Sequence, residues 1–185
     1  MTYFGDHCFR VQSGELSILV NPSSNRLKGD LVLRTITSTA PSPQAEGEVS
    51  FPGEYEMKDI VVRGFPLAQE SSEKFLKTAY LVQWEEVSLV FLGHLSKTID
   101  GELLEELGEP DILFVPTGDE HFIAPEAAAK LVKQLGPAIV IPSYSKDAKA
   151  FSKAFGQNPS PQEKFVFKKK DLAGKKGEVV VLAIG

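Results

Sequence analysis

The chain has 185 residues, of which 42% are hydrophobic and 24% are charged, and its formal net charge is −5 at pH 7. This length and composition are typical of one globular domain with a substantial core. A single cysteine excludes an internal disulfide framework and any multi-cysteine metal site, and with three histidines a metal centre would depend on carboxylates. The mild acidity disfavours nucleic-acid binding, which usually needs a basic excess.

The sequence contains no targeting or membrane-spanning segment. No stretch approaches the roughly 18 apolar residues that a spanning helix needs. The N-terminus carries Asp6 and lacks the basic and apolar regions of a secretory signal. With a free cysteine and no such segment, we expect a cytoplasmic protein that does not contact a membrane.

The first half of the sequence predicts strands joined by tight turns. Residues 8–11 and 15–20 flank a Gln-Ser-Gly turn and predict a hairpin. Further strands are predicted at residues 31–35, 54–57, 60–65, 78–84 and 87–92. The Pro, Ser and Gly content of residues 37–48 predicts a loop, and residues 69–74 predict another.

The second half predicts alternating helices and strands. Helices are predicted at residues 100–107, 125–135 and 147–155, each followed by a glycine, and strands at residues 111–115, 138–141, 164–167 and 178–184. No linker divides the halves, so we expect one domain over residues 1–185. Hairpins followed by strand–helix units predict an α/β (α+β) fold, with two mixed sheets packed face to face and helices outside them.

Seven segments, in this order along the chain, resemble the metallo-β-lactamase-fold superfamily, in particular small bacterial metal-dependent hydrolases of that fold. They are GDHCF (5–9), GDLVLRT (29–35), PGEYE (52–56), FLGHL (91–95), DILFVPT (111–117), residues 125–135 and IVIPSY (139–144). The resemblance covers residues 1–150. It implies an αβ/βα four-layer sandwich with the active site at one edge, built from loops at strand ends.

The resemblance also implies a dinuclear metal centre, but the expected ligand positions hold other residues. A His-x-His-x-Asp-His loop is expected after the strand that ends at Thr35. Its His positions hold Ile36, Ser38 and Pro41, and its Asp position holds Ala40. Ile36, Ala40 and Pro41 offer no side-chain donor, and a serine hydroxyl is a poor ligand at neutral pH.

Four further positions of the expected pocket also depart from the family pattern. The early Gly-His pair reads Gly5-Asp6, and a later His falls near Gln69. The bridging Asp is replaced by His94, and the His after Ile-Pro is replaced around Ser143-Tyr144. We therefore expect these residues to lie at the pocket: Asp6, Ile36, Ser38, Ala40, Pro41, Gln69, His94 and Tyr144. Without a metal to activate water, the family mechanism cannot run through its usual residues.

A smaller metal site remains an alternative. Asp6, His94 and His121 each follow or adjoin a predicted strand end, and two imidazoles with one carboxylate can hold one zinc or another divalent transition ion. The competing interpretation makes His94 and His121 half-exposed loop residues and Asp6 a residue that caps a turn. His7 is not expected to assist Asp6, because successive strand residues point to opposite faces.

Other chemically suggestive residues have structural explanations. Cys8 lies among apolar residues, so we expect a buried side chain rather than a nucleophile. The Pro52-Gly53 turn explains the segment that carries Glu54 and Tyr55. No G-x-S-x-G elbow and no phosphate-binding glycine loop is present.

A lysine cluster near the C-terminus is the only basic concentration. It comprises Lys164, Lys168, Lys169, Lys170, Lys175 and Lys176. We interpret it as a solvated hairpin whose charges discourage edge-to-edge pairing, with nucleic-acid binding as the minor alternative.

The sequence thus favours a metal-free protein of the metallo-β-lactamase fold, without a cofactor and with a binding or assembly role. The alternative is a hydrolase of phosphoesters or lactones with a reduced or displaced metal site. A third interpretation is an interaction module that forms homo-oligomers through an apolar concavity left by the missing polar residues. No partner can be named from the residues.

Overall fold

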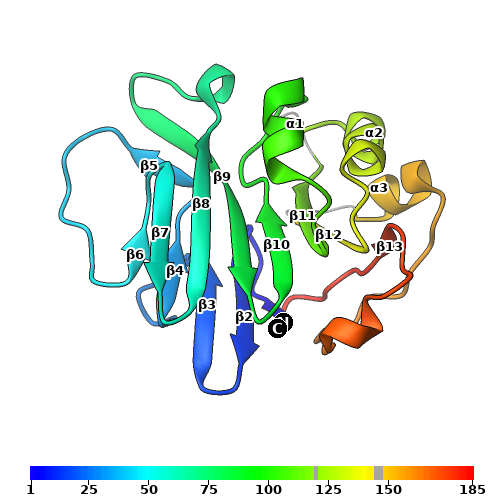
Figure 1. The fold of residues 1–185 in the computed structure, drawn as a ribbon. Helices are drawn as coiled ribbons and strands as arrows, with labels where there is room; N and C mark the ends of the chain where they lie inside the picture. Colours follow the sequence, from blue (N-terminus) through cyan, green and yellow to red (C-terminus); the bar gives the residue numbers. More distant parts are fainter. Residues whose placement is uncertain (119–120, 144–147) are drawn as a thin grey trace.

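Two mixed β-sheets pack face to face in the computed structural model, which describes residues 1–118, 121–143 and 148–185 (Figure 1). The small sheet has the order β1 (Thr2–Tyr3), β2 (Phe9–Ser13), β3 (Leu16–Val20), β4 (Leu31–Leu33) and β6 (Glu48–Val49). The large sheet has the order β13 (Glu178–Val179), β12 (Ile139–Ser143), β11 (Ile112–Pro116), β10 (Val87–Phe91), β9 (Phe75–Trp84), β8 (Ile60–Pro66) and β7 (Gly53–Met57). A short strand, β5 (Ile36–Ser38), pairs with β9.

Antiparallel hairpins build the first half, as predicted. The pairs β2–β3, β7–β8 and β9–β10 are each closed by a tight turn. In the turns Lys58-Asp59 and Glu85-Glu86, both central residues have positive φ, with values of 50° and 63° in each turn. This is the hairpin turn whose twist matches that of the strands.

Parallel strands with helical crossovers build the second half. Strands β10, β11, β12 and β13 are parallel neighbours. The helices are α1 (Gly101–Leu107), α2 (Pro125–Leu135) and α3 (Ala148–Phe155), and all three cover the outer face of the large sheet (Figure 1). The side chain of Asp100 accepts a hydrogen bond from the amide of Leu103 at the start of α1.

The predicted sandwich of two mixed sheets flanked by helices is confirmed, with one difference in its layers. Within the described residues, no α-helix covers the outer face of the small sheet. The crossovers on that side, residues 21–30 and 34–47, are rich in Pro, Ser and Gly. Such sequences favour turns over helices, so the fourth layer of the αβ/βα arrangement does not form there.

The core consists of two apolar layers. One lies between the sheets and includes Phe9, Phe91 and Phe114, and the other lies between the large sheet and the helices. The rings of Phe91 and Phe114 stack with centroids 4.2 Å apart, and Phe9 meets Phe114 edge-on at 4.9 Å. Offset and edge-on aromatic contacts of this kind add to the stabilisation from buried area.

Three predicted elements differ from the structure. Residues 37 and 38 of the predicted loop lie in β5, because β9 extends far enough to pair with them. The strand predicted at residues 178–184 ends at Val179, and only isolated bridges follow it. Residues 164–167 form no strand, so the predicted lysine-rich hairpin does not exist. Phe165 and Phe167 do face the core while Val166 is 85% exposed, but the backbone of this segment pairs only at Phe165, which exchanges two hydrogen bonds with Met1, over 3.2 and 2.7 Å, so no ladder extends along it within the described residues. A short 3-10 helix, η2 (Lys169–Asp171), follows instead, and η1 (Ala68–Glu70) precedes β9.

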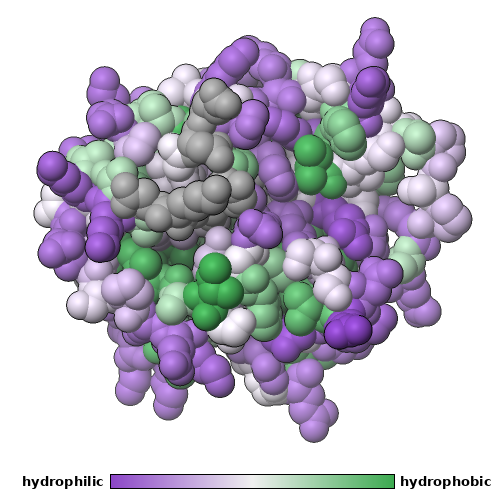
Figure 2. All heavy atoms as spheres, turned by 180° about the vertical axis from the view of Figure 1, so that it is seen from behind, coloured by the Kyte–Doolittle hydropathy of each residue, from purple (hydrophilic) through white to green (hydrophobic). Residues whose placement is uncertain are grey.

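The chain ends converge, and the surface is mostly polar. Tyr3 and Ile184 form a parallel bridge, and both termini lie together at the lower edge of the view (Figure 1). The opposite face shows hydrophilic side chains over most of its area, with apolar ones gathered around its middle (Figure 2). Among the described residues, no helix has both the length and the apolar character to span a bilayer.

The aromatic stack makes a prediction for stability. Phe114→Ala should lower the free energy of unfolding by about 3–5 kcal/mol, since it removes a buried ring and leaves a cavity. Phe75→Ala is the matched control, because Phe75 is 48% exposed, and it should cost less than about 1 kcal/mol. Denaturant unfolding measures both, and equal losses would contradict the core described above.

Candidate functional site

His7 lies in a tight turn at the edge of the sandwich. Gly5, Asp6 and His7 all have positive φ, and the amide of Cys8 donates to the carbonyl of Gly5 over 2.7 Å. The turn leaves Asp6 exposed and buries His7, which is 3% exposed. The expected strand alternation at these residues is therefore wrong, because residues 5–7 are not a strand.

Two imidazoles meet at this edge. The ring of His7 lies 4.8 Å from the ring of His94, and Phe122 lies 4.7 Å from His7. Nδ1 of His7 is 3.1 Å from the hydroxyl of Ser143 at the end of β12. His94 follows the end of β10, so the pair is built by strand ends of the large sheet and a turn of the small one.

A side-chain clamp between Asn21 and Thr35 fixes His94. Asn21 Nδ2 donates to Thr35 Oγ1 and Asn21 Oδ1 accepts from the amide of Thr35, both over 2.8 Å. Thr35 Oγ1 lies 3.0 Å from Nδ1 of His94. This oxygen accepts from Asn21 and still has one proton and one lone pair, so it can either donate to Nδ1 or accept from it, according to which ring nitrogen of His94 carries the proton.

Gly93 permits this contact. Its φ is +62°, and a Cβ atom there would lie 2.4 Å from the Cβ of Thr35. Real Cβ atoms do not approach that closely, and the left-handed backbone also disfavours a larger residue. The glycine before His94 therefore has a steric function at this site.

A buried carboxylate holds the loop that carries His94. Glu70 accepts from the amides of Ser96 and Lys97 over 3.0 and 2.7 Å, and from the Ser96 hydroxyl over 2.6 Å. Lys77 Nζ lies 3.3 Å from Glu70 and donates to the carbonyl of His94 over 2.8 Å. Burial raises the pKa of Glu70, but these hydrogen bonds more than offset it, so its pKa lies below the usual value.

Both imidazoles are neutral at pH 7. Burial, with a smaller contribution from His94, lowers the pKa of His7 to about 3. Burial, with a smaller contribution from the charge of Lys77, lowers the pKa of His94 to about 4. The site is thus a hydrogen-bonded pair of uncharged rings.

The other expected pocket residues do not join this pair. Asp6, Gln69 and His121 are exposed, and so are Ser38, Ala40 and Pro41. Tyr144 lies outside the described residues. Over residues 1–118, 121–143 and 148–185, no three His, Cys, Asp or Glu side chains are grouped so as to hold a metal ion, and the trio Asp6, His94 and His121 is therefore not such a group.

The segment expected to carry the metal-binding loop begins with a strand, β5, which pairs with β9. Ile36 pairs with Lys77 and Ser38 with Phe75 in the β5–β9 ladder, and the amide of Thr39 donates to the carbonyl of Lys74 over 3.0 Å. The Ser38 hydroxyl accepts from the amide of Ala40 over 3.2 Å. The Ser38 hydroxyl and the Thr39 amide therefore make hydrogen bonds to neighbouring backbone groups.

A small cavity adjoins His7 within the described part of the chain. A cavity of about 10 Å³ is lined by His7, Asn21, Thr35, Gly93 and Ser143 among others. That volume holds about one water molecule at most.

Sequence reasoning missed His7, Asn21 and Thr35 as parts of the site. The signal available for His7 was the Gly5-Asp6 pair, since both residue types favour turns and positive φ. Cys8, in contrast, is fully buried as predicted, and burial raises its pKa, which disfavours a thiolate nucleophile. The Tyr55 hydroxyl donates to the carbonyl of Phe51 over 3.0 Å, in keeping with a structural part for this segment.

Residues 1–144 match the family model described as the beta-lactamase superfamily domain. The chain belongs to this superfamily. A metal-dependent hydrolase of Methanopyrus kandleri is 34% identical over 65 residues, which cover 35% of this chain and 28% of that protein. The chain therefore matches well under a third of the length of this relative.

Several solved structures have the same fold as this chain. A metallo-β-lactamase superfamily protein of Thermotoga maritima has a TM-score of 0.75 at 22% identity, over 98% of this chain and 96% of its own. Igni18, a metallo hydrolase of Ignicoccus hospitalis, has a TM-score of 0.68 at 16% identity, over 100% and 94%. The metallo-β-lactamase fold protein YhfI of Bacillus subtilis has a TM-score of 0.65 at 11% identity, over 100% and 95%.

The buried imidazoles predict a pH dependence of stability. An unfolded histidine titrates near pH 6.5, whereas the pKa values of the folded His7 and His94 are about 3 and about 4. Below pH 6.5 the unfolded chain binds more protons than the folded one, so the free energy of unfolding decreases as the pH is lowered. Each imidazole adds a slope approaching about 1.4 kcal/mol per pH unit.

Urea unfolding between pH 7 and pH 5 measures this slope. This range is chosen because most carboxylates titrate below it. His94→Gln should remove about half of the histidine contribution. Phe122→Leu keeps both imidazoles and should leave the slope unchanged. A slope in His94→Gln equal to that of the parent protein would contradict a buried, neutral His94.

Proposed function

We propose that this superfamily member is a cytoplasmic protein whose metal centre has been replaced by an uncharged, hydrogen-bonded histidine pair, and that it binds or assembles rather than hydrolyses. The observation that carries the proposal is the hydrogen bonding of Thr35 to Nδ1 of His94. A ring that accepts at Nδ1 carries its proton on Nε2 and has no lone pair left for a metal. In metal sites the pattern is reversed, with Nδ1 or Nε2 donating to an outer partner.

The available donors do not fit a transition-metal centre. A catalytic zinc takes three protein ligands, usually with anionic or imidazole donors, at about 2.0–2.3 Å. Within the described residues, the His7–His94 pair has no third His, Cys, Asp or Glu grouped with it. Lys77 is a cationic neighbour of the pair, and its charge helps to lower the pKa of His94. A cationic neighbour opposes both proton and metal binding.

A metal-dependent hydrolase with a reduced site is the second candidate. Two observations favour it: the relative in Methanopyrus kandleri is named as a metal-dependent hydrolase, and two imidazoles lie in ring contact at the edge of the sandwich. On this alternative, His94 would donate its Nδ1 proton to Thr35 and bind the ion through Nε2. Phosphoesters and lactones are the substrate classes it would act on.

Metal content and metal-induced stabilisation distinguish the two candidates. Elemental analysis of purified protein should find no stoichiometric zinc, iron, manganese or nickel. Adding each ion should leave the melting temperature unchanged, whereas an ion at 100 times its Kd would add about 2.7 kcal/mol of stability. For a domain of this size that would be a rise of several degrees.

Thr35→Val is the informative variant, because it removes the hydroxyl that occupies Nδ1 of His94 while keeping the shape of the side chain. Ser38→Ala is its control, since Ser38 is exposed and bonds only to its own loop. A tightly held ion in the parent protein, together with turnover of a phosphoester or lactone that a chelator abolishes, would overturn the proposal in favour of the hydrolase.

A further inference from the structure

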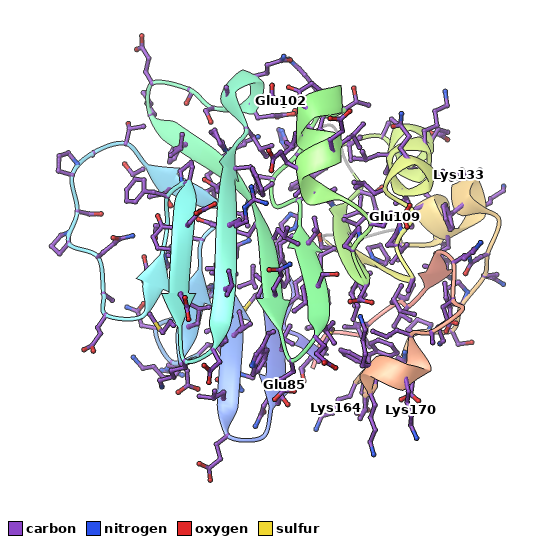
Figure 3. The ribbon with its side chains drawn as sticks, viewed as in Figure 1. Glu85, Glu102, Glu109, Lys133, Lys164 and Lys170 are labelled. Carbon is purple, nitrogen blue, oxygen red and sulfur yellow. The ribbon has the colours of Figure 1, made fainter. Side chains whose placement is uncertain are left out.

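A second cavity lies at the edge of the sandwich opposite to His7 and His94. Its volume is about 360 Å³, and its lining includes Val11 of β2, Trp84 at the end of β9 and Leu89 of β10. His94 follows the end of β10 and Trp84 precedes its start, so the length of the strand separates the two sites. The Glu85 turn marks this edge at the bottom of the view (Figure 3).

The lining of this cavity combines apolar and polar side chains from both sheets and the C-terminal segment. Trp84 and Leu89 belong to the core between the sheets, and Phe165 and Phe167 pack against it. The two phenylalanine rings stack with centroids 5.2 Å apart. A volume of this size falls within the range of about 300–1,000 Å³ that small-molecule sites occupy.

Two cations of the lining, Lys168 and the N-terminal ammonium group of Met1, have no counter-ion among the described residues, and the ammonium group donates a hydrogen bond to the carbonyl of Phe165 over 2.7 Å. Glu85 accepts a hydrogen bond from the Ser13 hydroxyl over 2.6 Å, and Lys169 pairs with Asp111 over 2.7 Å. Lys168, which also lines the cavity, forms no ion pair with any described residue.

The surrounding charge has the same sign. Residues 163–171 carry four lysines against two carboxylates. Lys164 and Lys170 point outward from this edge (Figure 3). The lining carries one carboxylate, Glu85, against Lys168, Lys169 and the N-terminal ammonium group of Met1, and this excess of positive charge suits an anionic group at the mouth.

The backbone of the same segment supplies further donors. Residues 164–168 lie outside any strand, so their amides are not used in a ladder. The amides of Val166 and Phe167 donate to no other described residue, whereas that of Lys168 donates to Asp171 over 2.8 Å. Free amides beside an ammonium group are the usual elements of carboxylate recognition.

We propose that this cavity binds a small amphipathic carboxylate such as a medium-chain fatty acid. The apolar chain lies between Trp84 and Leu89 of the sandwich and the rings of Phe165 and Phe167. The carboxylate lies at the mouth, next to Lys168 and the amides of residues 166 and 167. This site is independent of the histidine pair and goes beyond the proposed function.

The only tryptophan of the chain makes the proposal directly testable, because Trp84 lines the cavity. Titration of the intact protein with decanoate should change its tryptophan fluorescence saturably, and calorimetry should give one site per chain. Decanol and decyltrimethylammonium share the chain but lack the negative charge, so they should bind at least about tenfold more weakly, as expected for the loss of a charged hydrogen bond.

Lys168→Glu should weaken decanoate binding by at least about tenfold, since it reverses the charge at the mouth. Lys170→Glu is the matched control: it makes the same charge change two residues away, outside the lining, and should alter the affinity by less than about twofold, because exposed charges are screened. Circular dichroism checks that both variants fold.

Three results would overturn the proposal. Absence of a saturable fluorescence change with decanoate would exclude the site. Equal affinity for decanoate, decanol and the ammonium probe would show an apolar surface without carboxylate recognition. Equal weakening by Lys168→Glu and Lys170→Glu would show that decanoate responds to the overall positive charge of the segment and not to a specific contact at the cavity.

Discussion

The contact of Asn21 with Thr35, and of Thr35 with His94, determines the chemistry of the whole edge. It connects the end of β4 to the ring of His94 and holds that ring through its Nδ1 atom. Burying an imidazole is tolerable only when the ring is neutral and hydrogen-bonded. Gly93 provides the room for the contact, and Glu70 and Lys77 hold the loop beyond it. These features together hold two uncharged rings at this edge.

The same edge explains how a fold can be retained while its donors change. The apolar layers that hold the sandwich together lie between the sheets and beneath the helices, away from residues 36–41. Those residues contribute to the fold through backbone pairing with β9. Because backbone pairing tolerates most side chains, replacing the donors leaves the scaffold intact. Fold and chemistry are therefore separable here, as they are in many common folds.

Much of the architecture was predictable from the sequence, because local signals and tertiary packing agree. The hairpin turns, the glycines after α1 and α2, and the apolar runs of β10 to β12 each follow from residue type. The strand predicted at residues 164–167 fails for a tertiary reason: its alternation is real, but in the described part of the chain its backbone pairs with Met1 at Phe165 alone, which is too short for a strand. The histidine pair was beyond prediction for a related reason. His7 and His94 are far apart in the sequence, and only the meeting of a turn with a strand end unites them.

The hydrogen bond between Ser13 and Glu85 joins the two sheets at the edge opposite the histidines. It connects the β2–β3 hairpin to the β9–β10 hairpin, and Glu85 takes part from a turn position with a left-handed backbone, φ +50°. Ser13 and Glu85 both line the cavity that contains Trp84, so this single exposed hydrogen bond spans the two sheets at the wall of that cavity.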